Sequence, residues 1–70
     1  MRDIISGKAI KERRKVLDFT QEYVSAQLGV NRVTYAKYEL GLIAPRSDKL
    51  PELAKILNCT IDDLFDEDTA

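Results

Sequence analysis

The chain has 70 residues, with 11 Lys and Arg against 12 Asp and Glu, 44% hydrophobic residues, one cysteine and no histidine. This length predicts one small globular domain over residues 1–70, and the composition excludes an internal disulfide and argues against a metal site, a cofactor or a small-molecule ligand. No run of about 18 apolar residues is present and the first residues lack the apolar stretch of a secretion signal, so we expect a cytoplasmic protein without a membrane span.

The charges are unevenly distributed along the chain. Residues 1–50 carry ten Lys and Arg against six Asp and Glu, whereas residues 51–70 carry one Lys against six acidic residues. Nucleic-acid binding depends on the local field of one face, so the net charge of −1 does not exclude it. We interpret the acidic C-terminal tail, at about residues 66–70, as a solvated segment, with a partner-binding role as the alternative.

The first predicted helix covers about residues 7–17. Ile10, Arg14 and Leu17 fall along one side of it, and Ile4 and Ile5 precede it. Asp18 and Phe19 form the connection to the next element. Apolar alternation is absent throughout the chain, so no strand is predicted and the fold class is all-α.

Residues 21–40 carry the pattern of a helix-turn-helix. Thr20 is a suitable N-cap for the second helix, and Gly29 follows Ser25 by four residues, at the turn where positive φ is needed. Asn31 caps the third helix, and Gly41 ends it. Several positions that answer different geometric demands of the same bend agree in one register, which makes the pattern specific.

The C-terminal third predicts two more helices after a loop closed by Pro45. Ser47 is expected to cap a fourth helix that continues to about residue 57, and Thr60 with Asp63 forms a capping box for a short fifth helix. The positions expected to face or close the core are Leu50, Leu53, Ala54, Leu57, Leu64 and Phe65. The expected architecture is a compact five-helix bundle.

With these residues in place, the chain resembles the phage-repressor and Cro-like (XRE-type) family of helix-turn-helix transcriptional regulators. The resemblance rests on TQEYVSAQLGVNRVTYAKYELG, Pro45 and LAKILNCTIDDLF, and it extends over roughly residues 10–65. It implies a lambda-repressor-like fold, a homodimer, and binding to a short palindromic operator in double-stranded DNA. A sequence-specific regulator of transcription, most often a repressor, is the function that this family implies.

The third helix is the expected reader of DNA bases. Tyr35 and Tyr38 point to the core, so the residues out of phase with them face outward. The candidate base contacts are Arg32, Val33, Ala36 and Lys37. An Arg fork can bond O6 and N7 of guanine, and small apolar side chains can contact a thymine methyl group. The resemblance implies that Arg32, Val33 and Lys37 carry most base contacts; the alternative for Arg32 and Lys37 is a solvated charge.

The candidate phosphate contacts are Gln21, Asn31, Thr34, Arg46 and Lys49. Gln21 and Asn31 begin helices whose N-termini attract anions, and the resemblance implies that both positions contact the DNA backbone. Arg46 matches a backbone-contacting position of the family. For Asn31 the alternative is helix capping alone, and for Arg46 and Lys49 it is a solvated charge.

The resemblance also implies that Arg14 and Glu39 form an ion pair between the first and third helices. Such a bidentate pair would fix the angle of the reading helix without touching DNA. We expect Arg13 to cover the core with its stem while its charge reaches solvent, and Cys59 to act as a small buried hydrophobe.

The loop after the third helix departs from the family. It carries Leu40, Leu42, Ile43 and Ala44 where polar or basic residues are usual, and Leu40 replaces a position that often meets phosphate. These residues either pack into the core or form a surface for a second subunit. The candidate dimer contacts are Leu42, Ile43 and Phe65.

A second class of function is open to this sequence. An antitoxin or immunity-type regulator would bind a partner protein, with DNA binding secondary, and the acidic end and apolar loop would serve it. An enzyme is not expected, because there is no His and the lone Cys falls in a core register. The acidic residues between Asp62 and Asp68 lack the Gly turn and the alternating ligands of a calcium loop.

Overall fold

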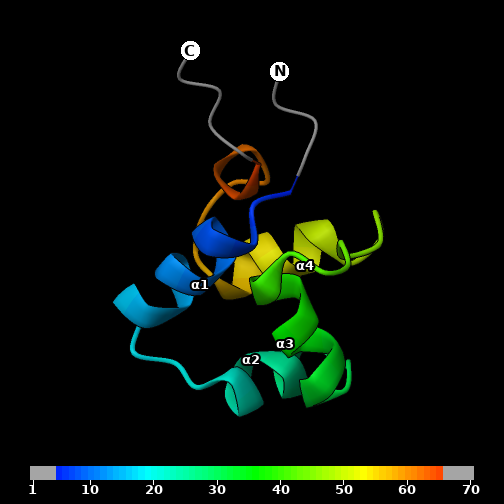
Figure 1. The fold of residues 1–70 in the computed structure, drawn as a ribbon. Helices are drawn as coiled ribbons and strands as arrows, with labels where there is room; N and C mark the ends of the chain where they lie inside the picture. The colour runs from blue at the N-terminus through cyan, green and yellow to red at the C-terminus, as the bar shows by residue number, and fades with distance from the viewer. Residues whose placement is uncertain (1–4, 66–70) are drawn as a thin grey trace.

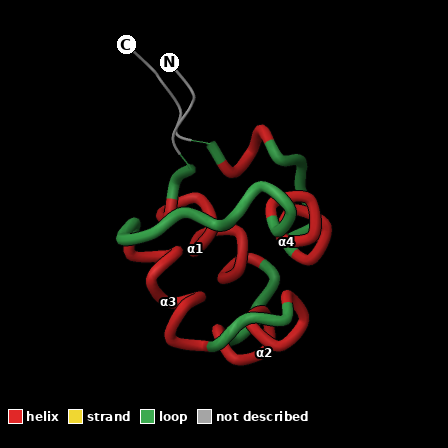
Figure 2. Tube along the Cα trace, turned by 90° about the vertical axis from the view of Figure 1, so that its right-hand side faces the viewer, coloured by secondary structure: helices red, strands yellow, loops and turns green. Residues whose placement is uncertain are grey.

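The computed structural model describes residues 5–65, and helices dominate them (Figures 1 and 2). Their order is α1 (Gly7–Val16), α2 (Gln21–Leu28), α3 (Arg32–Leu40), α4 (Leu50–Ile56) and the 3-10 helix η1 (Asp62–Leu64). The all-α class is confirmed, but the prediction of five α-helices is wrong, because the described residues hold four and a single 3-10 turn. The acidic tail at residues 66–70 and Ile4 lie outside the described residues.

The expected fifth helix is cut short by the extended chain at Phe65. Thr60 and Asp63 form the predicted capping box, with reciprocal bonds of 3.1 and 3.2 Å between each backbone N–H and the other side chain. The chain then turns extended at Phe65, which pairs with Ile5 in an isolated antiparallel bridge. This pairing with the segment before α1 leaves room for one helical turn only.

Side-chain caps begin three of the helices. The Thr20 hydroxyl and the Asn31 amide oxygen accept backbone N–H groups of the first turns of α2 and α3, at 3.0 and 2.7 Å, as predicted. Ser6 caps α1 in the same way. The predicted cap of α4 by Ser47 is wrong: Ser47 lies in a turn, and α4 begins after Lys49, which forms no side-chain cap. A turn closed on the Arg46 carbonyl sets the start of α4 instead.

The four α-helices of residues 5–65 all end in the same backbone motif. A residue with positive φ follows each helix, namely Asp18, Gly29, Gly41 and Asn58. Its N–H bonds to the carbonyl three residues earlier, and the next N–H bonds to the carbonyl five residues earlier. This is the Schellman motif, which satisfies terminal carbonyls and turns the chain sharply. Gly29 and Gly41 were predicted in this role, whereas Asp18 and Asn58 were not.

The core lies between the helices, with α1 and α2 packed on α3, and α2 also packed on α4. The buried apolar side chains come from every helix: Ile10, Val24, Leu28, Tyr35, Tyr38, Leu53, Ala54, Leu57 and Leu64. Among the other expected core positions, Leu17, Leu50 and Phe65 are only half-buried. Burial of these side chains from separate helices holds α3 against the rest of the bundle.

Gly7 allows α1 to approach the end of α3 very closely. A Cβ atom at Gly7 would lie 2.5 Å from the Tyr38 carbonyl oxygen and 2.6 Å from that of Glu39. Real Cβ atoms do not come so near to backbone atoms, so only glycine fits here. The start of α1 is therefore fitted to the backbone of the last turn of α3.

Candidate nucleic-acid interface

Helix α3 has a buried side and an exposed side. Tyr35, Tyr38 and Glu39 are buried, whereas Val33 is 56% exposed although it is apolar. The other candidate base contacts on α3 are exposed (Arg32, Lys37) or half-buried (Ala36). Residues 32, 33, 36 and 37 share one face of a helix, so the structure brings these four side chains together on the surface.

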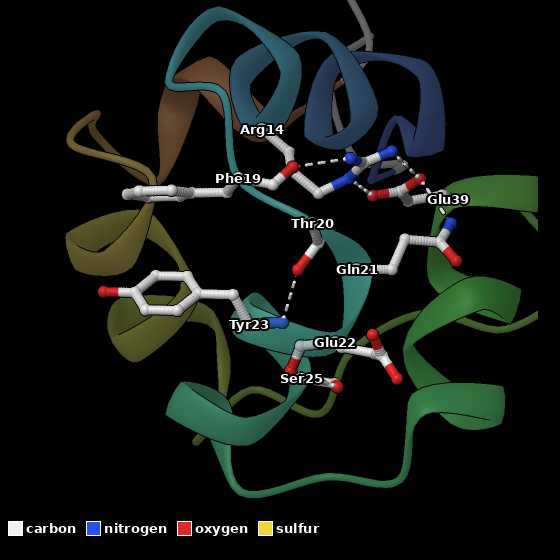
Figure 3. Close-up of polar contacts among 8 residues, drawn as sticks. All are labelled: Arg14, Phe19, Thr20, Gln21, Glu22, Tyr23, Ser25 and Glu39. Atoms are coloured by element: carbon white, nitrogen blue, oxygen red, sulfur yellow. Dashed lines mark hydrogen bonds and ion pairs between the residues drawn. The ribbon is translucent and has the colours of Figure 1, made fainter.

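An ion pair anchors the buried side of α3 to α1 (Figure 3). Nε of Arg14 donates to Oε2 of Glu39 at 2.6 Å, and a second guanidinium nitrogen donates to Oε1 at 3.2 Å. Arg14 also donates to the Phe19 carbonyl at 2.8 Å, in the connection before α2. The Arg14 side chain is only 12% exposed and the Glu39 side chain only 3%. The pair expected from the resemblance is therefore present, and it links α1, the α1–α2 connection and α3.

The pair perturbs the pKa of both partners. Burial acts to raise the pKa of Glu39, but hydrogen bonds, from Arg14 above all, outweigh it and lower the pKa of this carboxyl. The hydrogen bond to Glu39 raises the pKa of Arg14. Both groups therefore keep their charges inside the fold. Replacing either one would leave a charge buried without its partner.

The Tyr35 hydroxyl lies near this pair but forms no hydrogen bond within the described residues. Burial is the main cause that raises the pKa of this phenol above its ordinary value, and the Glu39 carboxylate is the second. The Tyr35 ring also meets Tyr38 edge-on, with ring centroids 6.1 Å apart. Tyr35 is therefore a neutral core residue that packs the inner side of α3.

Gln21, the first residue of α2, belongs to the same network. Its side-chain amide donates to Oε1 of Glu39 at 2.9 Å, as Figure 3 shows. Nothing in the spacing of the sequence predicted this bond between α2 and α3. The bond to Glu39 uses one of the two N–H groups of this amide, so its second N–H and its oxygen can still bind other groups.

The N-termini of α2 and α3 open on one surface depression. Gln21 and Arg32 both line it, so the structure brings a candidate phosphate contact next to a candidate base contact. Asp18 and Glu22 line it as well, and their carboxylates weaken the positive field of the two helix ends. Thr34 is half-buried, and Asn31, exposed, uses its side-chain oxygen as the α3 cap.

The two remaining candidate phosphate contacts, Arg46 and Lys49, differ in their exposure and in their contacts within the protein. The Arg46 side chain is 85% exposed and lies 3.7 Å from Asp48 in an exposed ion pair. The Lys49 side chain is 29% exposed, and its amine donates to the Leu28 carbonyl at 3.0 Å. Arg46 is thus open to solvent, whereas Lys49 is bound to the end of α2, a contact that sequence reasoning missed.

The loop between α3 and α4 presents apolar side chains to solvent. Leu42 and Ile43 in the loop are exposed, as is Leu40 at the end of α3, so these residues do not pack into the core of this chain. Pro45, in the middle of this loop, is buried. Phe65, the third candidate dimer contact, lies in a different segment, where it pairs with Ile5. Of the two alternatives for the loop, packing into the core is therefore wrong.

Two further residues behave differently from a simple core or surface pattern. The Arg13 guanidinium lies 3.5 Å from Asp63, and both side chains remain more than two-fifths exposed, so this ion pair adds little stability. Cys59 is half-buried rather than fully buried, and burial raises the pKa of its thiol.

Within residues 5–65 we find no cluster of metal-ligating side chains and no helix that could cross a membrane.

This chain is similar to known proteins in both sequence and fold. The sequence matches the family described as "Helix-turn-helix" over residues 10–64, more than half of the chain. The chain belongs to this helix-turn-helix family. The match includes α2 and α3, whose capped starts, Gly29 turn and packed inner faces form the motif itself. The resemblance to Cro-like and phage-repressor regulators is thereby confirmed.

A curated relative is the "Cryptic phage CTXphi transcriptional repressor RstR" of Vibrio cholerae serotype O1. It is 36% identical over 59 residues, which cover 79% of this chain and 53% of the relative. The chain therefore spans about half the length of this relative.

Solved structures share this fold, and two of them illustrate the range of the match. One is the P22 c2 repressor in complex with a synthetic operator, with a TM-score of 0.79, 33% identity, and coverage of 83% of this chain and 88% of that one. The other is the hydroxypropylphosphonic acid epoxidase of S. wedmorenis, with a TM-score of 0.78 and 23% identity. That match covers 86% of this chain but only 32% of the epoxidase chain, so it shows a shared fold alone.

Proposed function

We propose that this protein is a transcriptional repressor that binds a short palindromic operator in double-stranded DNA as a homodimer, with α3 in the major groove. The observation that carries the proposal is the exposed face of α3. There an apolar Val33 stands in solvent beside Arg32 and Lys37, while the opposite face is held by the core and by Glu39. A helix fixed on one side and open on the other suits a groove reader.

The exposed face of α3 offers chemistry for bases. Arg32 lies at the first position of α3, the end that enters the groove most deeply, and its fork suits guanine. Val33 and Ala36 suit thymine methyl groups, and Lys37, one turn beyond Val33, suits a base acceptor or a phosphate. We expect Arg32 to set the choice at one base pair of each half-site.

The surroundings of α3 offer contacts to the DNA backbone. Gln21 and Asn31 stand at the starts of α2 and α3, where helix N-termini attract phosphate, and Thr34 follows on α3. Arg46 in the next loop is free enough to reach a phosphate. These contacts fix the register of the protein on DNA without reading its sequence.

The homodimer is assigned to the exposed apolar loop, with Leu42 and Ile43, and to Phe65. Two copies related by two-fold symmetry would read half-sites about 10 bp apart, one turn of DNA. The relatives support this scheme: one is named a transcriptional repressor, and the other is bound to an operator. The same exposed loop also supports the alternative of an antitoxin-like regulator that binds a partner protein.

The proposal is tested by selecting bound duplexes from a random DNA pool and by sedimentation of the free protein. We expect enrichment of one palindrome and a dimer whose formation is weakened by Leu42→Ser. Lys55→Ser, which changes an exposed residue on α4, is the matched control. A monomer without enrichment, showing only weak salt-sensitive binding, would favour the partner-binding alternative.

A further inference from the structure

A lysine next to the start of α4 caps the C-terminal end of α2 by donating to its last carbonyl. Lys49 directly precedes α4, and its Nζ donates to the carbonyl of Leu28, 21 residues earlier and the last residue of α2. Gly29 comes next in the chain and begins the turn into α3. A Cβ built at Gly29 would lie 3.7 Å from the same Nζ, so the amine sits at the turn itself.

The end of α2 lacks any other source of positive charge on its own helix. No basic residue occupies its last turn. The Schellman motif satisfies the carbonyls of Ser25 and Ala26, through the N–H groups of Gly29 and Val30. The Leu28 carbonyl receives the Lys49 amine instead, and a cation at this position also complements the partial negative charge of the helix C-terminus.

The same contact makes Lys49 a poor phosphate ligand. Its amine is bound to Leu28 and lies 3.8 Å from the Glu52 carboxylate, which offsets its charge. Its side chain is much less exposed than that of Arg46, three residues earlier. The Leu28 carbonyl therefore holds this amine at the end of α2.

We infer that Lys49 is a positioning residue that fixes the turn between α2 and α3, and thereby α3, rather than a contact to the DNA backbone. The contact ties together α4, the end of α2 and the turn from which α3 emerges. The part of this inference that concerns DNA rests on the proposed function. The part that concerns the turn can be tested on the free protein.

The first experiment measures amide hydrogen exchange of Gly29 and Val30 in the free protein. Lys49→Met should speed their exchange by about two- to fivefold relative to wild type, because it removes the cap and its charge. Lys49→Arg should restore slow exchange, and Lys55→Met should leave it unchanged. Unchanged exchange in Lys49→Met would overturn the inference. Should Lys49→Met not fold, Lys49→Gln replaces it with the same expected direction.

The second experiment measures binding to a random-sequence duplex over a range of salt concentrations. Arg46→Met should lower the salt slope by about 1, whereas Lys49→Met should keep the wild-type slope. A loss of about 1 in the slope for Lys49→Met would show a phosphate contact and overturn the inference. If wild type binds no duplex, the proposed function fails, while the exchange experiment still decides the role of Lys49 in the turn.

The third measurement separates positioning from stability alone. With the duplex selected from the random pool, Lys49→Met should lose about threefold or more in the ratio of selected to random affinity, and Lys55→Met should not. Lys49→Arg should recover the ratio. A folded Lys49→Met protein with the wild-type ratio would overturn the assignment of Lys49 as a positioning residue.

Discussion

Arg14 and Glu39 lie 25 residues apart in sequence, yet the Nε of one is 2.6 Å from the Oε2 of the other. Arg14 stands in the last turn of α1, and Glu39 is the penultimate residue of α3. The pair is almost fully buried, and Gln21 at the start of α2 adds a third bond. Three helices therefore meet on one carboxylate, directly behind the exposed face of α3.

Removing one partner of this pair should destabilise the protein strongly. Arg14→Met strands the Glu39 charge in the interior, and we expect a loss of about 3–5 kcal/mol in the free energy of unfolding. The double variant Arg14→Met with Glu39→Leu should recover much of this loss, because no charge stays buried. Urea denaturation of both variants measures these two free energies. A double variant as unstable as Arg14→Met would show that the stranded charge is not the cause of the loss.

The lowered pKa of Glu39 predicts how stability depends on pH. The folded pKa lies below the ordinary value, so the stabilisation is complete above that ordinary value, 4.5, and is lost as pH falls toward the lowered pKa. We expect the free energy of unfolding to decrease below about pH 4.5. Glu39→Gln should show a weaker decrease over the same range when followed by urea denaturation. An identical pH dependence would show that Glu39 is not responsible.

Gly7→Ala should disturb the contact between α1 and α3. The added Cβ would lie 2.5 Å from the Tyr38 carbonyl oxygen, and backbone atoms cannot give way as a flexible side chain can. We expect a loss of about 1–3 kcal/mol in the free energy of unfolding, although alanine favours helices over glycine. Lys8→Ala, at the exposed neighbouring position of α1, is the matched control and should be nearly neutral. A stabilised Gly7→Ala protein would contradict the close approach.

Replacing Asn58 with glycine should raise the stability of the protein, and replacing it with alanine should lower it. It follows α4 with φ of 56°, a conformation that costs a residue with a Cβ roughly 1–2 kcal/mol and asparagine somewhat less. We expect Asn58→Ala to lower the melting temperature and Asn58→Gly to raise it slightly. Both variants remove the same amide, so their difference isolates the backbone conformation. Equal melting temperatures would contradict the left-handed assignment.

Much of the fold was predictable because local signals agreed. Thr20, Asn31, Gly29 and Gly41 each answer a demand of the backbone within a few residues, and all four stand where they were expected. Asp18 and Asn58 were missed because aspartate and asparagine also occur in ordinary loops. The length of the last helix was missed because the bridge from Phe65 to Ile5 depends on the tertiary fold.

The candidate site was predictable in its outline and not in its internal bonds. The helical spacing of Tyr35 and Tyr38 was enough to place residues 32, 33, 36 and 37 on the other face of α3. The bonds from Gln21 to Glu39 and from Lys49 to Leu28 join elements that no spacing rule relates. The bond from Lys49 changes the interpretation of one candidate phosphate contact. The bond from Gln21 leaves one N–H of its amide able to donate to a phosphate.

The measurement that tests the central claim most directly is selection of duplexes from a random pool by wild type, Arg32→Ala and the control Lys55→Ala. We predict one enriched palindrome for wild type and for Lys55→Ala. Arg32→Ala should keep the palindrome but lose the preference at one base pair of each half-site, at a cost of about 1–3 kcal/mol there. An unchanged preference in Arg32→Ala, or a uniform loss on every sequence, would contradict base reading by α3.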